Sequence, residues 1–149
     1  MSSTDSQPHQ EAFSEEERAA LKETAAETRK RRRPGHTRTD DEAEVLTKIA
    51  EMPEADRMLA ERVHTIIRQN APNLAPRTWY GMPAYANDAG KIICFFQPAA
   101  KFKARYATLG FNDAAALDKG AMWPTAFALT AMTSQTEEQI TSLIRRAVS

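Results

Sequence analysis

The sequence offers little from which a cross-linked or membrane-anchored structure could be built. Cys94 is the one cysteine among 149 residues, so no internal disulfide can form and nothing calls for an oxidising compartment. Residues 1–10 are polar and lack the apolar core of a secretory signal. No apolar run approaches the ~20 residues that cross a bilayer. These absences predict a cytoplasmic protein with no membrane partner.

An excess of either charge is also absent, since Lys+Arg and Asp+Glu each number 20. A chain with zero formal net charge attracts nucleic acid or membranes only through local patches. The densest basic patch, residues 29–33 followed by Arg38, fits non-specific contact with phosphates. It has no interleaved aromatic residues, and basic side chains are also favourable at a helix C-terminus. Nucleic acid is therefore not the partner that we expect.

Catalytic signatures are missing as well. The chain has no G-x-S-x-G, Walker, Cys-x-x-Cys or G-x-G-x-x-G motif. Cys94 stands in an apolar segment, which is typical of a small buried side chain, and none of the histidines (His9, His36 and His64) is placed to activate it. The sequence therefore assigns no catalytic residue.

The start of the chain differs in character from the rest. Residues 1–12 are polar and are predicted to be disordered. Ser14 and Glu17 then fit a capping box, followed by a helix whose apolar residues are mostly alanine. Because this helix has little to bury, we assign residues 1–38 to a tail and a charged helical arm, and residues 39–149 to the folded domain.

The domain itself shows helical periodicity first and strand patterns later. A second capping box at Thr39 begins two helices that end before Pro72, and an amphipathic helix from about Thr136 closes the chain. Four strands are predicted, at residues 79–86, with Gly81 inside the strand, and at 91–97, 105–111 and 126–130. Short turns between strands favour antiparallel pairing. We therefore expect an α+β fold, with a small antiparallel sheet of about four strands packed against the N-terminal helices and the C-terminal helix.

Residues 79–85, WYGMPAY, resemble the "YGMPAY" segment of the YdhG-like family, a bacterial family of unknown function. The likeness spans residues 42–148 and continues in the segments 94–97, 101–103, 108–111 and 123–124. Some members of this family are described as frataxin-like intracellular iron chaperones. The resemblance thus implies a cytosolic, non-enzymatic binding protein that is iron-chaperone-like and holds Fe(II) transiently on surface carboxylates.

An acidic segment is the place to look for such a metal site. Residues 40–61 hold eight carboxylates against Lys48 and Arg57, and oxygen ligands suit hard cations. The candidate metal ligands are Glu54, Asp56, Glu61 and His64. Glu61 and His64 share a helix face at i,i+3 spacing, yet one such pair falls short of a di-iron site. The alternative is an acidic surface that is merely solvated and stabilises helix starts.

Aromatic and lysine side chains crowd the predicted strands and suggest a second candidate site. The expected ligand-binding residues are Trp79, Tyr80, Met82, Tyr85, Phe96, Lys101, Lys103 and Tyr106. An aromatic wall with cationic groups suits an anionic or aromatic small molecule. Because alternate strand residues face opposite sides, some of these side chains must belong to the core. This groove is the basis of the alternative function, a small-molecule-binding or enzymatic domain.

Overall fold

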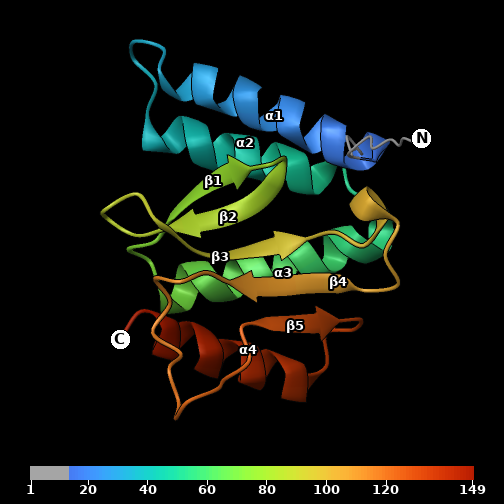
Figure 1. The fold of residues 1–149 in the computed structure, drawn as a ribbon, viewed down its shortest axis with the longest axis vertical. Coiled ribbons are helices and arrows are strands. Elements are labelled where there is room, and N and C mark those ends of the chain that lie inside the picture. The colour runs from blue at the N-terminus through green and yellow to red at the C-terminus, as the bar shows by residue number, and fades with distance from the viewer. Residues whose placement is uncertain (1–13) are drawn as a thin grey trace, which may run out of the picture.

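A computed structural model describes residues 14–149 and shows four α-helices and one antiparallel sheet (Figure 1). The elements are α1 (Glu15–Arg31), α2 (Arg38–Ala50), α3 (Glu54–Asn70), β1 (Ala75–Trp79), β2 (Met82–Ala86), β3 (Ile92–Gln97), the 3-10 helix η1 (Ala100–Phe102), β4 (Ala107–Phe111), β5 (Ala126–Leu129) and α4 (Ser134–Ala147). The strands follow one another in the order β1-β2-β3-β4-β5. The predicted α+β class is confirmed, with five strands in place of about four. The disorder predicted for residues 1–12 lies outside the described residues.

The additional strand arises because the segment predicted as one strand is half of a hairpin. Trp79 ends β1 and pairs with Met82, which begins β2. Tyr80 and Gly81 between them have φ of +52° and +74°, the left-handed values that a two-residue turn matched to strand twist requires. The placement of Gly81 inside a strand is therefore wrong, because it occupies the turn.

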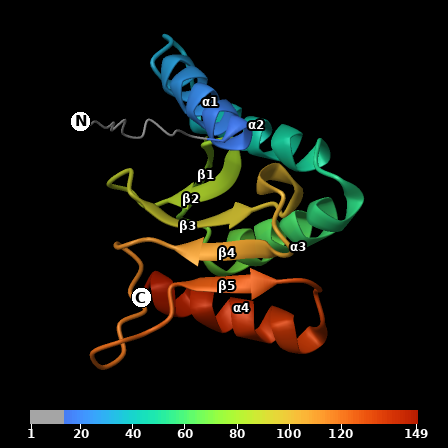
Figure 2. The ribbon, with the colours of Figure 1, turned by 45° about the vertical axis from the view of Figure 1, so that its right-hand side comes forward.

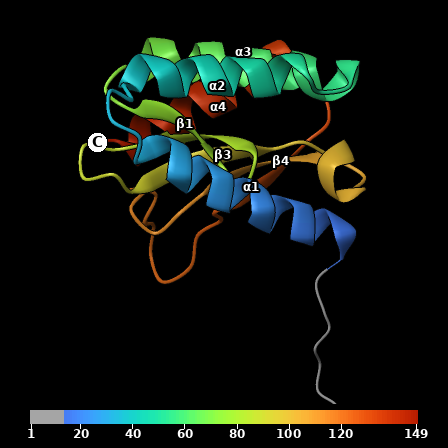
Figure 3. The same cartoon turned by 90° about the horizontal axis from the view of Figure 1, so that it is seen from above.

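Side chains on the two faces of the sheet differ in size. Tyr85, Phe96 and Leu109 are fully buried and belong to the large core that the sheet shares with the helices. Figure 3 shows α2, α3 and α4 as one layer over this face. The other face carries small residues with Trp79 and Phe95 packed edge to face at 5.3 Å. Alternation along each strand thus separates a helix-covered face from an open one.

Helix α1 lies outside the three-helix layer. Figure 2 shows it next to α2 at the β1 edge of the sheet, and Figure 3 shows the two helices on opposite sides of that edge. Its predicted capping box is present, with Ser14 and Glu17 exchanging hydrogen bonds. The second predicted cap, at Thr39, is wrong because Thr37 caps α2 and Asp40 completes the box. The helix consequently begins at Arg38, one residue before the proposed start of the domain.

The amphipathic C-terminal helix begins slightly earlier than predicted. Thr133 caps α4 by accepting a hydrogen bond from the Thr136 amide, so the helix starts at Ser134. Ile140 and Ile144 are buried against the core, as their spacing predicts. Within residues 14–149, no helix has the length and apolar character needed to span a membrane.

Candidate functional site

One face of α1 is polar where a docking helix would normally be apolar. Glu16, Glu23 and Glu27 recur at spacings of seven and four residues, which places them along one side of the helix. Only Ala20 and Glu27 of this helix are buried. The contacts that hold α1 to the rest of the protein are therefore mainly hydrogen bonds and ion pairs.

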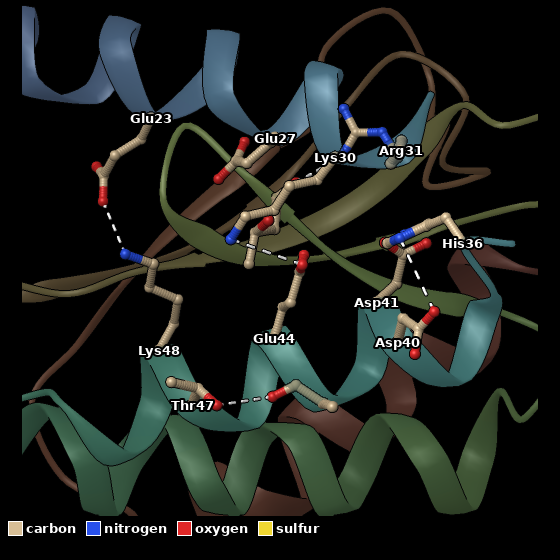
Figure 4. A network of polar contacts seen from close by, with 12 residues as sticks. Glu23, Glu27, Lys30, Arg31, His36, Asp40, Asp41, Glu44, Thr47 and Lys48 are labelled. Atoms are coloured by element: carbon tan, nitrogen blue, oxygen red, sulfur yellow. Dashed lines mark hydrogen bonds and ion pairs between the residues drawn. The ribbon is translucent and has the colours of Figure 1, made fainter. Parts of the chain in front are cut away.

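Glu23 stands at the centre of these contacts and is bound by two lysines. Lys48 of α2 donates to its Oε2 at 3.0 Å, and Lys101 of η1 donates to its Oε1. Figure 4 shows the first of these pairs between α1 and α2. Burial by itself would raise the pKa of Glu23, but the two lysine hydrogen bonds outweigh it and hold the pKa below its ordinary value. Glu23 is thus a carboxylate bound in a cationic setting.

Glu27 lies one turn further along and is only 7% exposed. Its Oε2 accepts a hydrogen bond from the Gly81 amide at 2.8 Å, whereas its buried Oε1 has no hydrogen-bond partner. Burial raises the pKa of Glu27, and the Gly81 bond offsets this only in part. The carboxylate therefore occupies its position at a cost that the Gly81 amide, with smaller contributions from Thr78 and Arg31, does not remove.

Arg77 of β1 is a cation that, like Glu27, has a buried polar atom without a hydrogen-bond partner. Its buried Nε has no hydrogen-bond partner. Burial lowers the pKa of Arg77, Arg31 lowers it further, and Asp41 and Glu27 act in the opposite direction. Arg31 itself donates to the Thr78 carbonyl at 3.4 Å. Arg77 is partly buried, and its buried Nε donor has capacity for an additional acceptor.

We call Lys48, Arg77, Gly81 and Lys101 the hairpin cradle. Two observations favour glycine at position 81. Its φ is positive, and a Cβ there would lie 2.3 Å from an oxygen of Glu23. The start of η1, which carries Lys101, is fixed by the Asp56 carboxylate, which accepts the amides of Ala99 at 2.9 Å and Ala100 at 3.0 Å. Lys48, Lys101 and the Gly81 N–H contact the carboxylates of α1, and Arg77 interacts electrostatically with Glu27. This arrangement also suits a carboxylate or phosphate ligand.

No known protein family, curated protein or solved structure matches the chain. The resemblance of residues 79–85 to the YdhG-like family accordingly stays an expectation from those residues. What the protein does must be argued from the arrangement of its own side chains.

Several residues of the predicted groove lie near the cradle. Trp79 and Tyr80 are half-buried and meet edge to face at 5.1 Å beside the turn. Lys101 is part of the cradle itself. Lys103 is exposed and pairs with Glu16 at 2.9 Å, which raises the pKa of Lys103 and lowers that of Glu16.

The other groove residues are placed elsewhere. Tyr85 and Phe96 are fully buried and belong to the core that the sheet shares with the helices. Met82 is buried as well. Tyr106 is 37% exposed and has Arg105 over its ring. The sheet thus divides the eight predicted residues between the core, the turn region and the surface.

The predicted metal ligands are similarly dispersed. Asp56 is buried and holds the loop amides described above, whereas Glu54 and Glu61 are exposed. His64 is buried, with Nδ1 2.8 Å from the Tyr85 hydroxyl. Among residues 14–149, no group of three or more His, Cys, Asp or Glu side chains is arranged to hold a metal ion.

His64 belongs to a polar network inside the core. Its Nε2 lies 3.5 Å from Glu42, which also pairs with Arg68 at 3.3 Å. Burial lowers the pKa of His64 against the opposing effect of Glu42, and burial raises the pKa of Tyr85 well above its ordinary value. Cys94 is fully buried, which raises its pKa to about 12. These groups are suited to fixing the core rather than to meeting a substrate.

Sequence reasoning missed four of the residues that form the site: Glu23, Glu27, Lys48 and Arg77. The seven-residue interval from Glu16 to Glu23, with Glu27 four residues later, was the available signal. It shows that the carboxylates share a face, and it does not show what that face contacts.

Proposed function

We propose that this is a non-enzymatic binding protein that holds a small anionic molecule, a carboxylate or phosphate, in the hairpin cradle. The observation that carries the proposal is the Glu23 carboxylate, held by Lys48 and Lys101 next to the Gly81 turn. The cradle already binds a carboxylate of the same chain. A free ligand would take its place.

The contacts of α1 support exchange of this kind. Glu23 and its two lysines are partly exposed, so solvent screens their attraction. Glu27 gains little from its buried position, because one of its oxygens is unpaired. A ligand that bonds to the Arg77 Nε as well as to the two lysines and the Gly81 amide would add an interaction that α1 does not make. Its apparent affinity is reduced by the fraction of molecules in which α1 occupies the cradle.

Iron binding, which the family resemblance implies, stays a prediction. Glu54, Asp56 and Glu61 do not converge on one point, and Asp56 already accepts two amides. An exposed acidic surface would hold Fe(II) only weakly and transiently. A cytoplasmic location belongs to the same proposal, because both candidate ligands are small cellular ions.

The test compares ligand-induced stabilisation in the full chain. Inorganic phosphate and succinate are titrated into wild type, Glu23→Gln and the matched control Glu61→Gln, an exposed carboxylate of α3. A ligand at a hundred times its Kd stabilises by about 2.7 kcal/mol, which for a chain of this size raises Tm by roughly 5–10 °C. We expect the largest rise in Glu23→Gln, with Glu61→Gln resembling wild type.

Adding Lys101→Met to the Glu23→Gln background should abolish the rise. A Tm that neither anion changes in any of the proteins would refute the anion proposal. Anaerobic Fe(II) calorimetry provides the separate test of the iron expectation. Saturable heat that is lost on neutralising Glu54, Asp56 and Glu61 would favour iron as the ligand.

A further inference from the structure

Strand β5 forms a free edge of the sheet. The Phe111 amide donates to the Thr125 carbonyl at 2.7 Å, and the ladder continues with Leu109 opposite Phe127. In an antiparallel pair, residues that bond to one neighbour alternate with residues whose backbone groups face the other way. The N–H and C=O groups of Ala126 and Ala128 therefore point away from β4.

This edge is short, at four residues, but it lacks the charged and proline residues by which sheets often prevent pairing. Residues 126–129 are Ala-Phe-Ala-Leu, with no charged residue and no proline. Ala126 and Ala128 are exposed, and their side chains are small enough for a neighbouring strand to approach. The edge is thus open to one more strand.

Helix α4 lies beside β5 at the same end of the molecule, as Figures 1 and 2 agree. An open groove of about 610 Å³ is lined by both elements. Its lining includes Phe127, Leu129, Glu138, Ile140, Ser142 and Arg146. A partner that pairs with β5 would therefore meet the outer side of α4 as well.

The exposed stripe of α4 is complementary to itself. Ser142, a small residue, lies midway between Glu138 and Arg146, four residues from each. All three are exposed and line the grooves on both sides of the helix. Two such helices crossing antiparallel at Ser142 would place Glu138 of each against Arg146 of the other. Arg146 also donates to the Leu117 carbonyl at 3.2 Å, which leaves further guanidinium donors available.

We propose that a second copy of this chain binds here, through a two-fold axis that pairs β5 with β5 and α4 with α4. With the axis at Phe127, Ala126 of each copy exchanges N–H···O=C bonds with Ala128 of the other. The two sheets then continue as one antiparallel sheet of ten strands, five from each copy. The interface is isologous, as a two-fold requires, because strand and helix each present a symmetric pattern.

Sedimentation velocity of the full chain over a range of concentrations tests the proposal. We expect a concentration-dependent dimer in wild type. Glu138→Arg places like charges together and should weaken dimerisation about tenfold or more, as should Arg146→Glu. The double variant Glu138→Arg/Arg146→Glu should restore it, an outcome that a merely structural effect of either change would not produce.

A backbone variant makes the test independent of charge. Ala128→Pro removes an outward N–H without touching the β4 ladder and should also give a monomer. Circular dichroism verifies that each variant is folded, and Glu61→Arg serves as the surface-charge control. A wild type that stays monomeric at hundreds of micromolar, or a double variant that fails to recover, would overturn the proposal.

Discussion

Replacing Glu23 by glutamine removes the charge that Lys48 and Lys101 share, and we expect a loss of stability at pH 7. Hydrogen bonds to charged groups contribute about 1.5–3 kcal/mol each when well buried. Glu23 is 28% exposed and Lys48 35%, so solvent screening reduces this contribution. The glutamine oxygen also keeps one acceptor. We expect a net loss of about 1–2 kcal/mol in the free energy of unfolding.

The dependence on pH fixes the sign of the effect. The folded pKa of Glu23 lies below its unfolded value, so its contribution is complete above the unfolded pKa of about 4.3 and is lost as pH falls through the folded value. Urea unfolding of wild type and Glu23→Gln, followed by tryptophan fluorescence, should differ at pH 7. The difference should shrink progressively as pH falls below the unfolded pKa of Glu23, because protonation removes the charge that the lysines bind.

Glu27→Gln is the matched comparison one helical turn away. Burial raises the pKa of Glu27, so the ionised form opposes folding and its cost grows as pH rises through the folded value. Glutamine keeps an oxygen for the Gly81 amide and removes the buried charge. We expect Glu27→Gln to be neutral or up to about 1 kcal/mol more stable than wild type at pH 7. Equal losses in both variants, or no loss in Glu23→Gln, would refute the reasoning.

Three further changes test other parts of the molecule. His64→Gln should flatten the loss of stability below about pH 6.5, because burial lowers the pKa of His64; an unchanged slope of urea midpoints against pH would contradict this. Gly110→Ala should lower the free energy of unfolding by about 1–3 kcal/mol in thermal unfolding, because a Cβ would lie 2.2 Å from the Phe95 ring. Adding Phe95→Leu should recover part of that loss, and additive losses in the double variant would argue against the contact. Cys94 should resist alkylation by iodoacetamide in the folded protein, because burial raises its pKa to about 12. If mass spectrometry detects rapid alkylation before unfolding, the thiol is accessible and this prediction is wrong.

Patterns that depend on neighbouring residues were readable from the sequence. The apolar stripe of α4 and the capping box of Ser14 are local, and both appear as predicted. Strand β1 was missed because its residues include Pro76 and Arg77, which give no strand-like alternation. Pro76 is tolerated there because β1 is at the edge of the sheet.

The cradle depends on contacts that no local pattern reveals. Glu23 meets Lys48 and Lys101 across 25 and 78 residues of chain, and Glu27 meets Gly81 across 54. The sequence pointed to Tyr80 and Lys101 because aromatic and cationic residues are conspicuous. It did not point to α1, because a helix of alanine and glutamate resembles a solvated surface helix.

Because α1 is attached mainly through polar contacts, we expect it to be held less stably than the rest of the described fold. Added salt weakens ion pairs at the surface, whereas it leaves the apolar contacts of α2, α3 and α4 intact. We therefore expect the first helix to detach in a local opening that costs less free energy than global unfolding. Hydrogen exchange in α1 should accelerate with ionic strength while the central strands stay protected, so the salt content of the surroundings sets how often the turn at Gly81 is uncovered.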